Sequence, residues 1–237
     1  PQALNALSAE LRNSIVLVFN ELAKDQETQV IIITGAGRAF TVGLDLKELG
    51  GEIDSVTKRS AEQVDVAMTA CPQPIIGAIN GFAITGGFEI ALMCDFLIAS
   101  TNAQFADTHA RVGVVPGWGI SQRLPRLIGI NRAKEVSLTG NYINAEKALD
   151  WGLINRITEP EDLLTSCIAL GRDILGTDPT TRNEIKKIMD QGWQTNLEKG
   201  LAIERKASQK HREKNLRPED VAMRRKGIQE RGRSQSN

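Results

Sequence analysis

The residues best suited to chemistry lie in NGFAITGGFEIALMCD, residues 80–95, whose pattern predicts a buried strand, a turn and a helix. Gly86 and Gly87 form the turn, where missing side chains let backbone N–H groups approach a ligand at the positive end of the helix dipole. Glu89 lies three residues after Gly86, on the same face of the first helical turn. An anion-binding amide beside a carboxylate base is what proton transfer next to a carbonyl group requires.

A simpler interpretation of this turn is a close crossing of helix and strand, with Glu89 solvated. The stretch lacks the GK[ST] of a P-loop and the GxGxxG of a dinucleotide-binding loop. A second glycine turn occurs in GAGRAFTVGLDLKEL, residues 35–49. There Gly43 permits a close backbone approach, and Asp45 can cap the helix that follows.

Five segments, in the same order, resemble the crotonase, or enoyl-CoA hydratase/isomerase, family. They are PQALNAL (1–7), VIIITGAGRAFTVGLDLKEL (30–49), PIIGAINGFAITGGFEIALMCDFLIAS (74–100), QFADTHARVGVVPGWGISQRLPRLIG (104–129) and LTGNYINAEKALDWGLINRI (138–157). The resemblance implies a crotonase spiral, an α/β fold of strand-strand-helix turns. It also implies a helical C-terminal segment that packs on neighbours in a trimer or a dimer of trimers. With this resemblance, the functional interpretation of the Gly86 turn prevails over the simpler one.

The resemblance implies a coenzyme A thioester as substrate. The sequence shows no metal or redox cofactor site, so neither a metal nor a cofactor is expected. In this family two backbone N–H groups hold the thioester oxygen, and the matching positions are Leu44 and Gly86. Glu89 matches a glutamate that acts as base on a water molecule. Segments that match the coenzyme A cradle and the acyl pocket supply the substrate-binding candidates Ala3, Leu4, Val42, Leu44, Asp45, Leu46, Gly86, Thr108, Pro116 and Gly117.

The main departure from the family is Thr108-His109, where typical hydratases have a Pro-Glu pair. His109 therefore stands in place of the second catalytic glutamate, and three interpretations stay open. It is an acid or base, since an unperturbed imidazole titrates near neutral pH, or it positions a water or acyl group, or it is a structural histidine. In an extended segment Asp107 would share a face with His109 and could orient the imidazole, but a solvent-facing aspartate is the favoured interpretation.

The leading function is addition of water to a trans-2-enoyl-CoA, with Glu89 and His109 as catalytic candidates. Double-bond isomerisation needs only one base and stays open, as does a non-catalytic acyl-CoA-binding protein. Residues 113–121 contain no aspartate, which disfavours the dehalogenase and dienoyl-isomerase members that use carboxylates there. Trp118, in the same turn, either narrows the acyl pocket or packs in the core.

The elements that must position these residues follow from apolar periodicity. Buried strands are predicted from four short apolar runs, at 30–34, 75–79, 96–100 and 154–158. Helices are predicted at 8–24, with Ser8 as its cap, and at 46–50, 58–70, 87–94, 131–139 and 144–151. Alternating strands and helices indicate a mainly parallel sheet. Beyond residue 160 only helices are predicted, at 160–175, 179–191, 194–214 and 219–231.

Composition agrees with a globular protein of 237 residues, predicted to comprise a core at 1–160 and a helical segment at 161–237. Charge is balanced at 29 Lys+Arg against 29 Asp+Glu, yet residues 201–237 carry a net +6. This basic tail and Lys47 either meet the phosphates of coenzyme A or are solvated. No nucleic acid partner is expected, since basic and aromatic residues do not alternate. Without an apolar stretch of membrane length, a cytoplasmic protein is expected, or a mitochondrial or peroxisomal one in a eukaryote.

Overall fold

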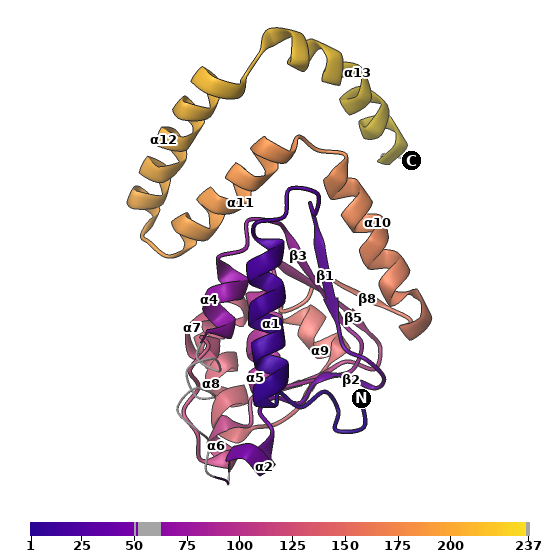
Figure 1. Ribbon diagram of the computed structural model, residues 1–237, viewed down its shortest axis with the longest axis vertical. Helices are drawn as coiled ribbons and strands as arrows, with labels where there is room; N and C mark the ends of the chain where they lie inside the picture. The colour runs from indigo at the N-terminus through magenta and orange to yellow at the C-terminus, as the bar shows by residue number, and fades with distance from the viewer. Residues whose placement is uncertain (50, 52–62, 236–237) are drawn as a thin grey trace. The chain divides into compact units, whose positions relative to one another are not determined.

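The computed structural model describes residues 1–49, 51 and 63–235 (Figure 1). Contacts divide the chain into two compact units, Pro1–Thr177 and Asp178–Asn237. Of the helix predicted at 58–70, residues 58–62 lie outside the described part of the chain, and α4 (Val64–Thr69) accounts for the rest. The domain boundary predicted at residue 160 stays a prediction.

The first sheet is fully parallel and contains the four predicted apolar runs. Its strands lie in the order β1 (Ile31–Thr34), β3 (Ile75–Ile79), β5 (Phe96–Ser100) and β8 (Arg156–Thr158). Every residue of β3 is buried, as its continuous apolar sequence predicts. The same prediction for β1 is wrong in part. Ile32 and Ile33 are only half-buried, because β1 lies at the edge of the sheet.

The second sheet consists of very short strands, of which only β4, the buried strand expected within residues 80–95, was predicted. Its order is β2 (Ala39–Thr41), β4 (Phe82–Ile84), β6 (Gln104–Ala106) and β7 (Ile143–Asn144). The strands β2, β4 and β6 run parallel, and β7 is antiparallel to β6. Two or three residues are too few to show a period of two, which is why β2, β6 and β7 were not predicted. Together the two sheets form the expected strand-strand-helix turns.

Helices of the first unit cover and penetrate this framework. They are α1 (Ala9–Leu22), α2 (Leu46–Leu49), α4 (Val64–Thr69), α5 (Gly86–Met93), α6 (His109–Val112), α7 (Ile120–Ile128), α8 (Ile130–Thr139), α9 (Ala145–Asp150), η1 (Pro160–Asp162) and α10 (Leu163–Leu175). The hydroxyl of Ser8 accepts a hydrogen bond from Leu11 N at 3.2 Å, which confirms the predicted cap of α1. The helices α6 and α7 were not predicted. Pro125 lies inside α7, and glycines precede this helix in the sequence. Both residue types are typical of loops, so the pattern did not indicate a helix there.

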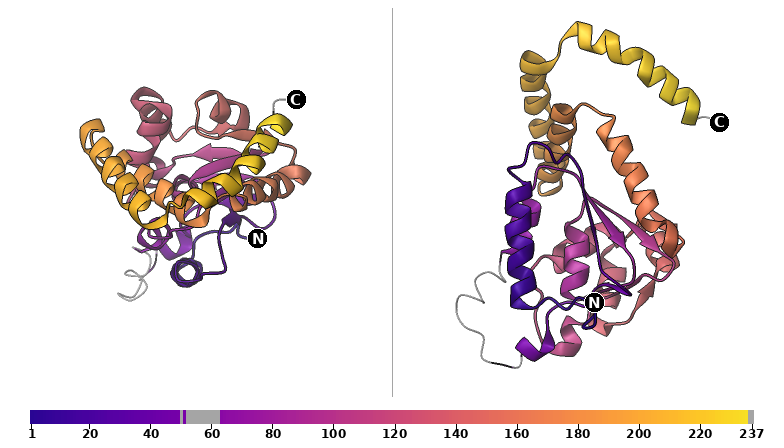
Figure 2. Two further views of the ribbon diagram at one scale, coloured as in Figure 1. Left: turned by 90° about the horizontal axis from the view of Figure 1, so that it is seen from above. Right: turned by 45° about the vertical axis from the view of Figure 1, so that its right-hand side comes forward.

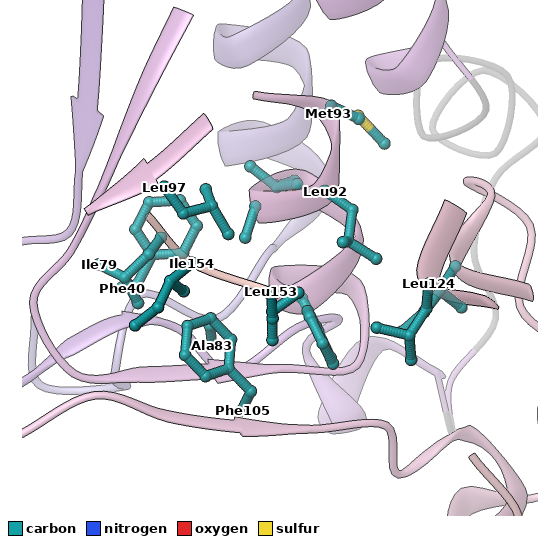
Figure 3. Packing of buried hydrophobic residues seen from close by; sticks show 14 of the residues in the cluster. Phe40, Ile79, Ala83, Leu92, Met93, Leu97, Phe105, Leu124, Leu153 and Ile154 are labelled. Atoms are coloured by element: carbon teal, nitrogen blue, oxygen red, sulfur yellow. The ribbon is translucent and has the colours of Figure 1, made fainter. Parts of the chain in front are cut away.

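The core surrounds α5, in which every residue is buried. A helix that is apolar on most sides belongs in the interior rather than on a surface. Figure 3 shows side chains from β3, β5, β6 and residues 153–154 converging near Leu92 of α5. The rings of Phe88 and Phe105 lie 5.3 Å apart between centroids. Glu89 is therefore carried into the hydrophobic core by its own helix.

The second unit contains α11 (Pro179–Trp193), α12 (Leu197–Asn215) and α13 (Pro218–Gln235). Pro179 and Pro218 stand at the start of their helices, where the first turn tolerates a residue without an N–H group. Figures 1 and 2 show α11 and α12 side by side, with Gly192 and Gly200 at their close approach. The helix predicted at 194–214 thus packs on α11. Among the helices described, none is long and apolar enough to cross a membrane.

Candidate active site

Three segments of the candidate site leave the carboxyl ends of adjacent parallel strands. Gly43 follows β2, Gly86 follows β4, and Asp107 follows β6. The register Thr41↔Ala83 and Ile84↔Ala106 aligns the ends of these strands. Ligands of parallel α/β sheets bind at such carboxyl ends, because the connections there converge. The second sheet is therefore what brings the two glycine turns and His109 together.

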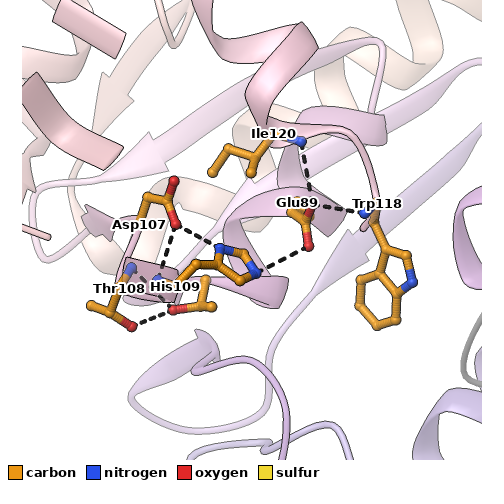
Figure 4. Close-up of polar contacts among 7 residues, drawn as sticks. Glu89, Asp107, Thr108, His109, Trp118 and Ile120 are labelled. Carbon is orange, nitrogen blue, oxygen red and sulfur yellow. Dashed lines mark hydrogen bonds and ion pairs between the residues drawn. The ribbon is translucent and has the colours of Figure 1, made fainter. Parts of the chain in front are cut away.

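Glu89 is held rigidly in the interior. Glu89 is only 2% exposed to solvent. Its Oε1 accepts hydrogen bonds from the backbone N–H groups of Trp118, at 2.9 Å, and Ile120, at 3.2 Å (Figure 4). The interpretation of Glu89 as a solvated side chain is wrong, because α5 is a central helix and not a surface one. The two donors direct the other oxygen, Oε2, toward His109.

Burial raises the pKa of Glu89 above its ordinary value, since desolvation disfavours the charged form. The N–H group of Ile120, the His109 ring and the N–H group of Trp118 oppose this shift without cancelling it. A carboxylate with a raised pKa is a stronger base than an exposed glutamate. Glu89 is therefore suited to act as a proton acceptor.

His109 lies between two carboxyl groups, and it is 5% exposed. Its Nε2 is 3.6 Å from Glu89 Oε2, and its Nδ1 is 2.6 Å from Asp107 Oδ1 (Figure 4). Asp107 is 1% exposed, so the expectation that it faces solvent is wrong. The reason is local: α6 begins at His109, and Asp107 Oδ1 also accepts the His109 backbone N–H at 3.3 Å. The turn directs the carboxylate of Asp107 toward Nδ1 of the His109 ring.

The pKa of Asp107 is lowered, although burial alone would raise it. Hydrogen bonds from the His109 ring, the Ser137 side chain and the His109 backbone outweigh the desolvation. Asp107 is thus the ionised partner in the site. Asp107, His109 and Glu89 form a continuous line of polar groups inside an apolar core.

The two candidate oxyanion donors lie on backbones that approach closely. Leu7 N donates to Gly43 O at 2.8 Å, and because the peptide is trans, the N–H of Leu44 points away from Leu7. Gly86 is the first residue of α5, where the helix supplies no acceptor for its N–H. A Cβ on Gly43 would lie 3.0 Å from Gly86 N and 2.8 Å from Ile84 O. Only glycine at position 43, with φ +86°, permits this approach.

The remaining candidates occupy the surroundings of these turns. Val42 N donates to Leu4 O at 3.3 Å, so the segment that contains Ala3 and Leu4 lies beside the start of the segment 42–46. Asp45 Oδ1 accepts Lys47 N at 2.9 Å, which confirms Asp45 as the cap of α2.

Thr108 contacts the turn before α5, because its hydroxyl pairs with the hydroxyl of Thr85. Pro116 and Gly117 precede the N–H groups that hold Glu89. The side chain of Leu46 lies outside what the structure describes. The ring of Trp118 would lie 3.3 Å from a Cβ on Gly86, so the indole is beside that turn.

Sequence reasoning missed three groups that shape the site. The N–H groups of Trp118 and Ile120 orient Glu89, and the side chain of Ser137 supports Asp107. Backbone donors have no residue signature, and Ser137 lies 30 positions from Asp107 on a helix of ordinary pattern. The glycine-rich turn at 117–119 was the only available signal that backbone groups are presented there.

The sequence profile for "Enoyl-CoA hydratase/isomerase" matches residues 1–230. The chain is 38% identical over 205 residues to "Probable enoyl-CoA hydratase 1, peroxisomal" of Arabidopsis thaliana, covering 86% of this chain and 77% of that protein. It is 34% identical over 209 residues to "Crotonyl-CoA hydratase" of Syntrophomonas wolfei, covering 86% of this chain and 80% of that protein.

Solved structures show the same similarity in three dimensions. An enoyl-CoA hydratase subunit I from Geobacillus kaustophilus superposes with a TM-score of 0.82 at 34% identity, covering 87% of this chain and 81% of that one. A putative enoyl-CoA hydratase from Thermobifida fusca, solved in complex with CoA, superposes with a TM-score of 0.81 at 26% identity. The coverage in that comparison is 89% of this chain and 86% of the other.

Proposed function

This chain belongs to the enoyl-CoA hydratase/isomerase family, and on that basis we propose that it adds water to the 2,3 double bond of a trans-2-enoyl-CoA. The observation that carries the proposal is the pair of Glu89 and His109. Both are buried, and Oε2 and Nε2 face each other at 3.6 Å beside the two glycine turns. Hydration requires one group to take a proton and one to supply a proton, and this pair provides both.

Glu89 Oε2 takes a proton from water, and the water oxygen bonds to C3 of the enoyl group. The π electrons of the C2=C3 bond shift toward the thioester, whose oxygen gains negative charge. His109 Nε2 then supplies a proton to C2, which restores the thioester carbonyl. Afterwards the proton on Glu89 returns to His109 across the same short gap. Atoms and charge balance, and the product is a 3-hydroxyacyl-CoA.

The N–H groups of Leu44 and Gly86 hold the thioester oxygen during this step. Donors that are already oriented stabilise the developing charge more than the ground state, and each contributes about 10²–10³ in rate. The coenzyme A portion lies along residues 1–4 and 42–46, near Lys47. The reaction needs no further cofactor, because the thioester itself accepts the electrons.

The test is mass spectrometry of the product formed from crotonyl-CoA in heavy-oxygen water. Oxygen incorporation that Glu89→Gln abolishes supports the hydratase, with the exposed Glu146→Gln on α9 as the matched control. A shifted double bond without label would establish the isomerase instead. Turnover that survives Glu89→Gln contradicts the mechanism.

A second variant tests His109. His109→Ala should lower kcat by about 10²–10⁴-fold, the typical contribution of a positioned acid or base, while KM changes little. Unchanged turnover would exclude proton transfer by His109 and leave Glu89 as the only base.

We further propose that the chain assembles as a trimer or a dimer of trimers through its helical second unit. Support comes from large apolar side chains that are exposed there on the single chain. These are Ile185, Met189, Trp193, Leu197, Leu201, Val221, Met223 and Ile228.

A further inference from the structure

We propose that Asp107 is a positioning residue that commits Nδ1 of His109 to the role of donor, so that Nε2 is the only ring nitrogen that exchanges a proton. This inference rests on the proposed function, since it specifies how His109 takes part in proton transfer. It assigns the site a line of three groups, Asp107, His109 and Glu89. The second carboxylate of a typical hydratase is thereby replaced by an oriented imidazole.

The geometry of Asp107 carries the argument. Its Oδ1 lies 2.6 Å from His109 Nδ1, a distance typical of a charge-assisted hydrogen bond. An ionised carboxylate can only accept, so Nδ1 must hold the proton of this bond. In a neutral ring Nε2 then has the free lone pair, and in a charged ring Nε2 has the proton that can leave. Either way the exchangeable position faces Glu89 Oε2 at 3.6 Å.

Asp107 is itself fixed in place, as a positioning group must be. It accepts hydrogen bonds from the His109 backbone N–H, at 3.3 Å, and from the side chain of Ser137 on α8. These bonds and the ring contact keep the pKa of Asp107 low although the side chain is buried. The charged groups that shift the pKa of Glu89 are His109 and Asp107, both members of the same line. The helix α8 contributes the neutral hydroxyl of Ser137, which donates to Asp107.

The two ring nitrogens of His109 have different partners, because Nε2 faces Glu89 and Nδ1 faces Asp107. Oε1 of Glu89 is occupied by the N–H groups of Trp118 and Ile120, so Oε2 is the oxygen turned to the ring. At 3.6 Å the two atoms are slightly too far apart for a direct hydrogen bond, yet one water molecule can contact both. The arrangement therefore lets the exchangeable nitrogen and the base contact the same reacting water, which would lie beside both atoms.

Nitrogen NMR tests the proposal without any activity measurement. The chain has only two histidines. His211 lies in the second unit, where it contacts Thr181, and it serves as an internal reference. Across a pH titration of the ¹⁵N-labelled full-length protein, Nδ1 of His109 should stay protonated while the Nε2 signal changes. In Asp107→Asn the signals of both His109 nitrogens should change with pH, whereas His211 should behave as it does in the wild type. A His109 ring that is unprotonated at Nδ1 in the wild type would overturn the proposal.

Kinetics supplies the second test. Asp107→Asn should lower kcat by about 10²-fold with KM nearly unchanged, because an oriented ring matters most in the transition state. The exposed Asp150→Asn on α9 is the charge-matched control and should leave kcat unchanged. In a His109→Glu background, Asp107→Asn should change kcat by less than about 3-fold, since there is no ring left to orient.

The outcomes separate this proposal from the proposed function. If the wild type hydrates crotonyl-CoA but Asp107→Asn retains full kcat, Asp107 has no positioning role and the hydratase stands. An equal loss from Asp107→Asn in the wild-type and in the His109→Glu background would mean that Asp107 acts structurally, which also overturns the inference. If the wild type does not hydrate crotonyl-CoA, the NMR titration still decides whether Asp107 orients the ring.

Discussion

At the scale of single residues, Glu89 shows how burial and hydrogen bonding act in opposite directions on one carboxylate. Two backbone donors favour its charged form, whereas the apolar surroundings of α5 disfavour it more strongly. The result is a base whose pKa is raised yet whose orientation is fixed. An exposed glutamate would have neither property.

The raised pKa of Glu89 predicts a pH dependence of stability. The native state holds this proton more tightly than the unfolded state, so the stabilisation is complete below about pH 4, the ordinary range of a glutamate. It is lost as pH rises through the native pKa. Glu89→Gln removes this loss, so its free energy of unfolding should gain on the wild type as pH increases.

Urea unfolding of both proteins at several pH values measures this difference. The exposed Glu146→Gln controls for the change in net charge. A difference between Glu89→Gln and the wild type that shrinks with increasing pH would contradict the prediction. Activity and stability are then opposed at this position, since the ionised carboxylate that serves as the base is the form that burial disfavours.

At the scale of elements, the ends of β2, β4 and β6 decide which segments meet. The turn after β2 must approach the first turn of α5, and the missing side chain of Gly43 makes that possible. A close backbone crossing and an anion site are therefore compatible here, although the sequence presents them as alternatives.

Gly43→Ala should lower kcat by about 10²-fold or more, because its Cβ would push the Leu44 and Gly86 amides apart. Gly152→Ala is a matched control, since Gly152 also has a positive φ, +75°, but nothing lies within 4 Å of an added Cβ. That control should lose about 1 kcal/mol of stability from backbone strain and keep its kcat. Steady-state kinetics and thermal unfolding separate the two effects, and equal losses of kcat would exclude the steric explanation.

The start of α1 is tied to α2 by a buried charge. Glu48 accepts Ala9 N through both carboxylate oxygens, at 2.9 and 3.2 Å, and pairs with Arg12 at 3.7 Å. Arg12 is 4% exposed, and burial lowers the pKa of its guanidinium. Arg12 also donates to Leu7 O, next to the bond that orients the Leu44 peptide.

Glu48→Ala should therefore lower the free energy of unfolding by about 2–4 kcal/mol, because it removes the carboxylate partner of a buried cation and the acceptor of the Ala9 N–H. Arg12→Met keeps the hydrogen bonds from Ala9 to Glu48 and removes the buried charge, so it should cost less. Urea unfolding of the two variants measures the order. A larger cost for Arg12→Met would show that packing of the guanidinium, rather than charge pairing, dominates.

At the scale of the whole molecule, the second unit differs from the first because its apolar side chains are not buried on the single chain. None of the described side chains from 178 to 234 is buried on the single chain, although the helices carry many apolar residues. Extended apolar surface of this kind is typical of interfaces and supports the proposed assembly.

Light scattering of the full-length chain should give the mass of three or six copies. Ile185→Glu with Met189→Glu, one turn apart on α11 and both at least half-exposed, should lower that mass. Lys187→Glu on the same helix, at an exposed polar position, is the control and should leave it unchanged. A wild-type chain with the mass of one copy would contradict the assembly.

What the sequence by itself determined is local or repetitive. Apolar runs of four or five residues predicted the strands of the first sheet, and Ser8, Asp45 and Pro179 marked helix starts. The glycine turns and Glu89 pointed to proton transfer beside an anion site, and the ordered motifs pointed to the family. These signals survive because propensity and periodicity act between neighbours in the chain.

Only the tertiary structure decided which groups meet. Apart from β4, the strands of the second sheet are too short to be predicted from the sequence, yet the register of β2, β4 and β6 brings Gly43, Gly86 and Asp107 to one edge of that sheet. The side-chain direction of Asp107 depends on where α6 begins, and the donors to Glu89 are backbone groups from a turn some 30 residues away. Burial, which sets the direction of the Glu89 pKa, is a property of the assembled core, because desolvation depends on every element packed around α5.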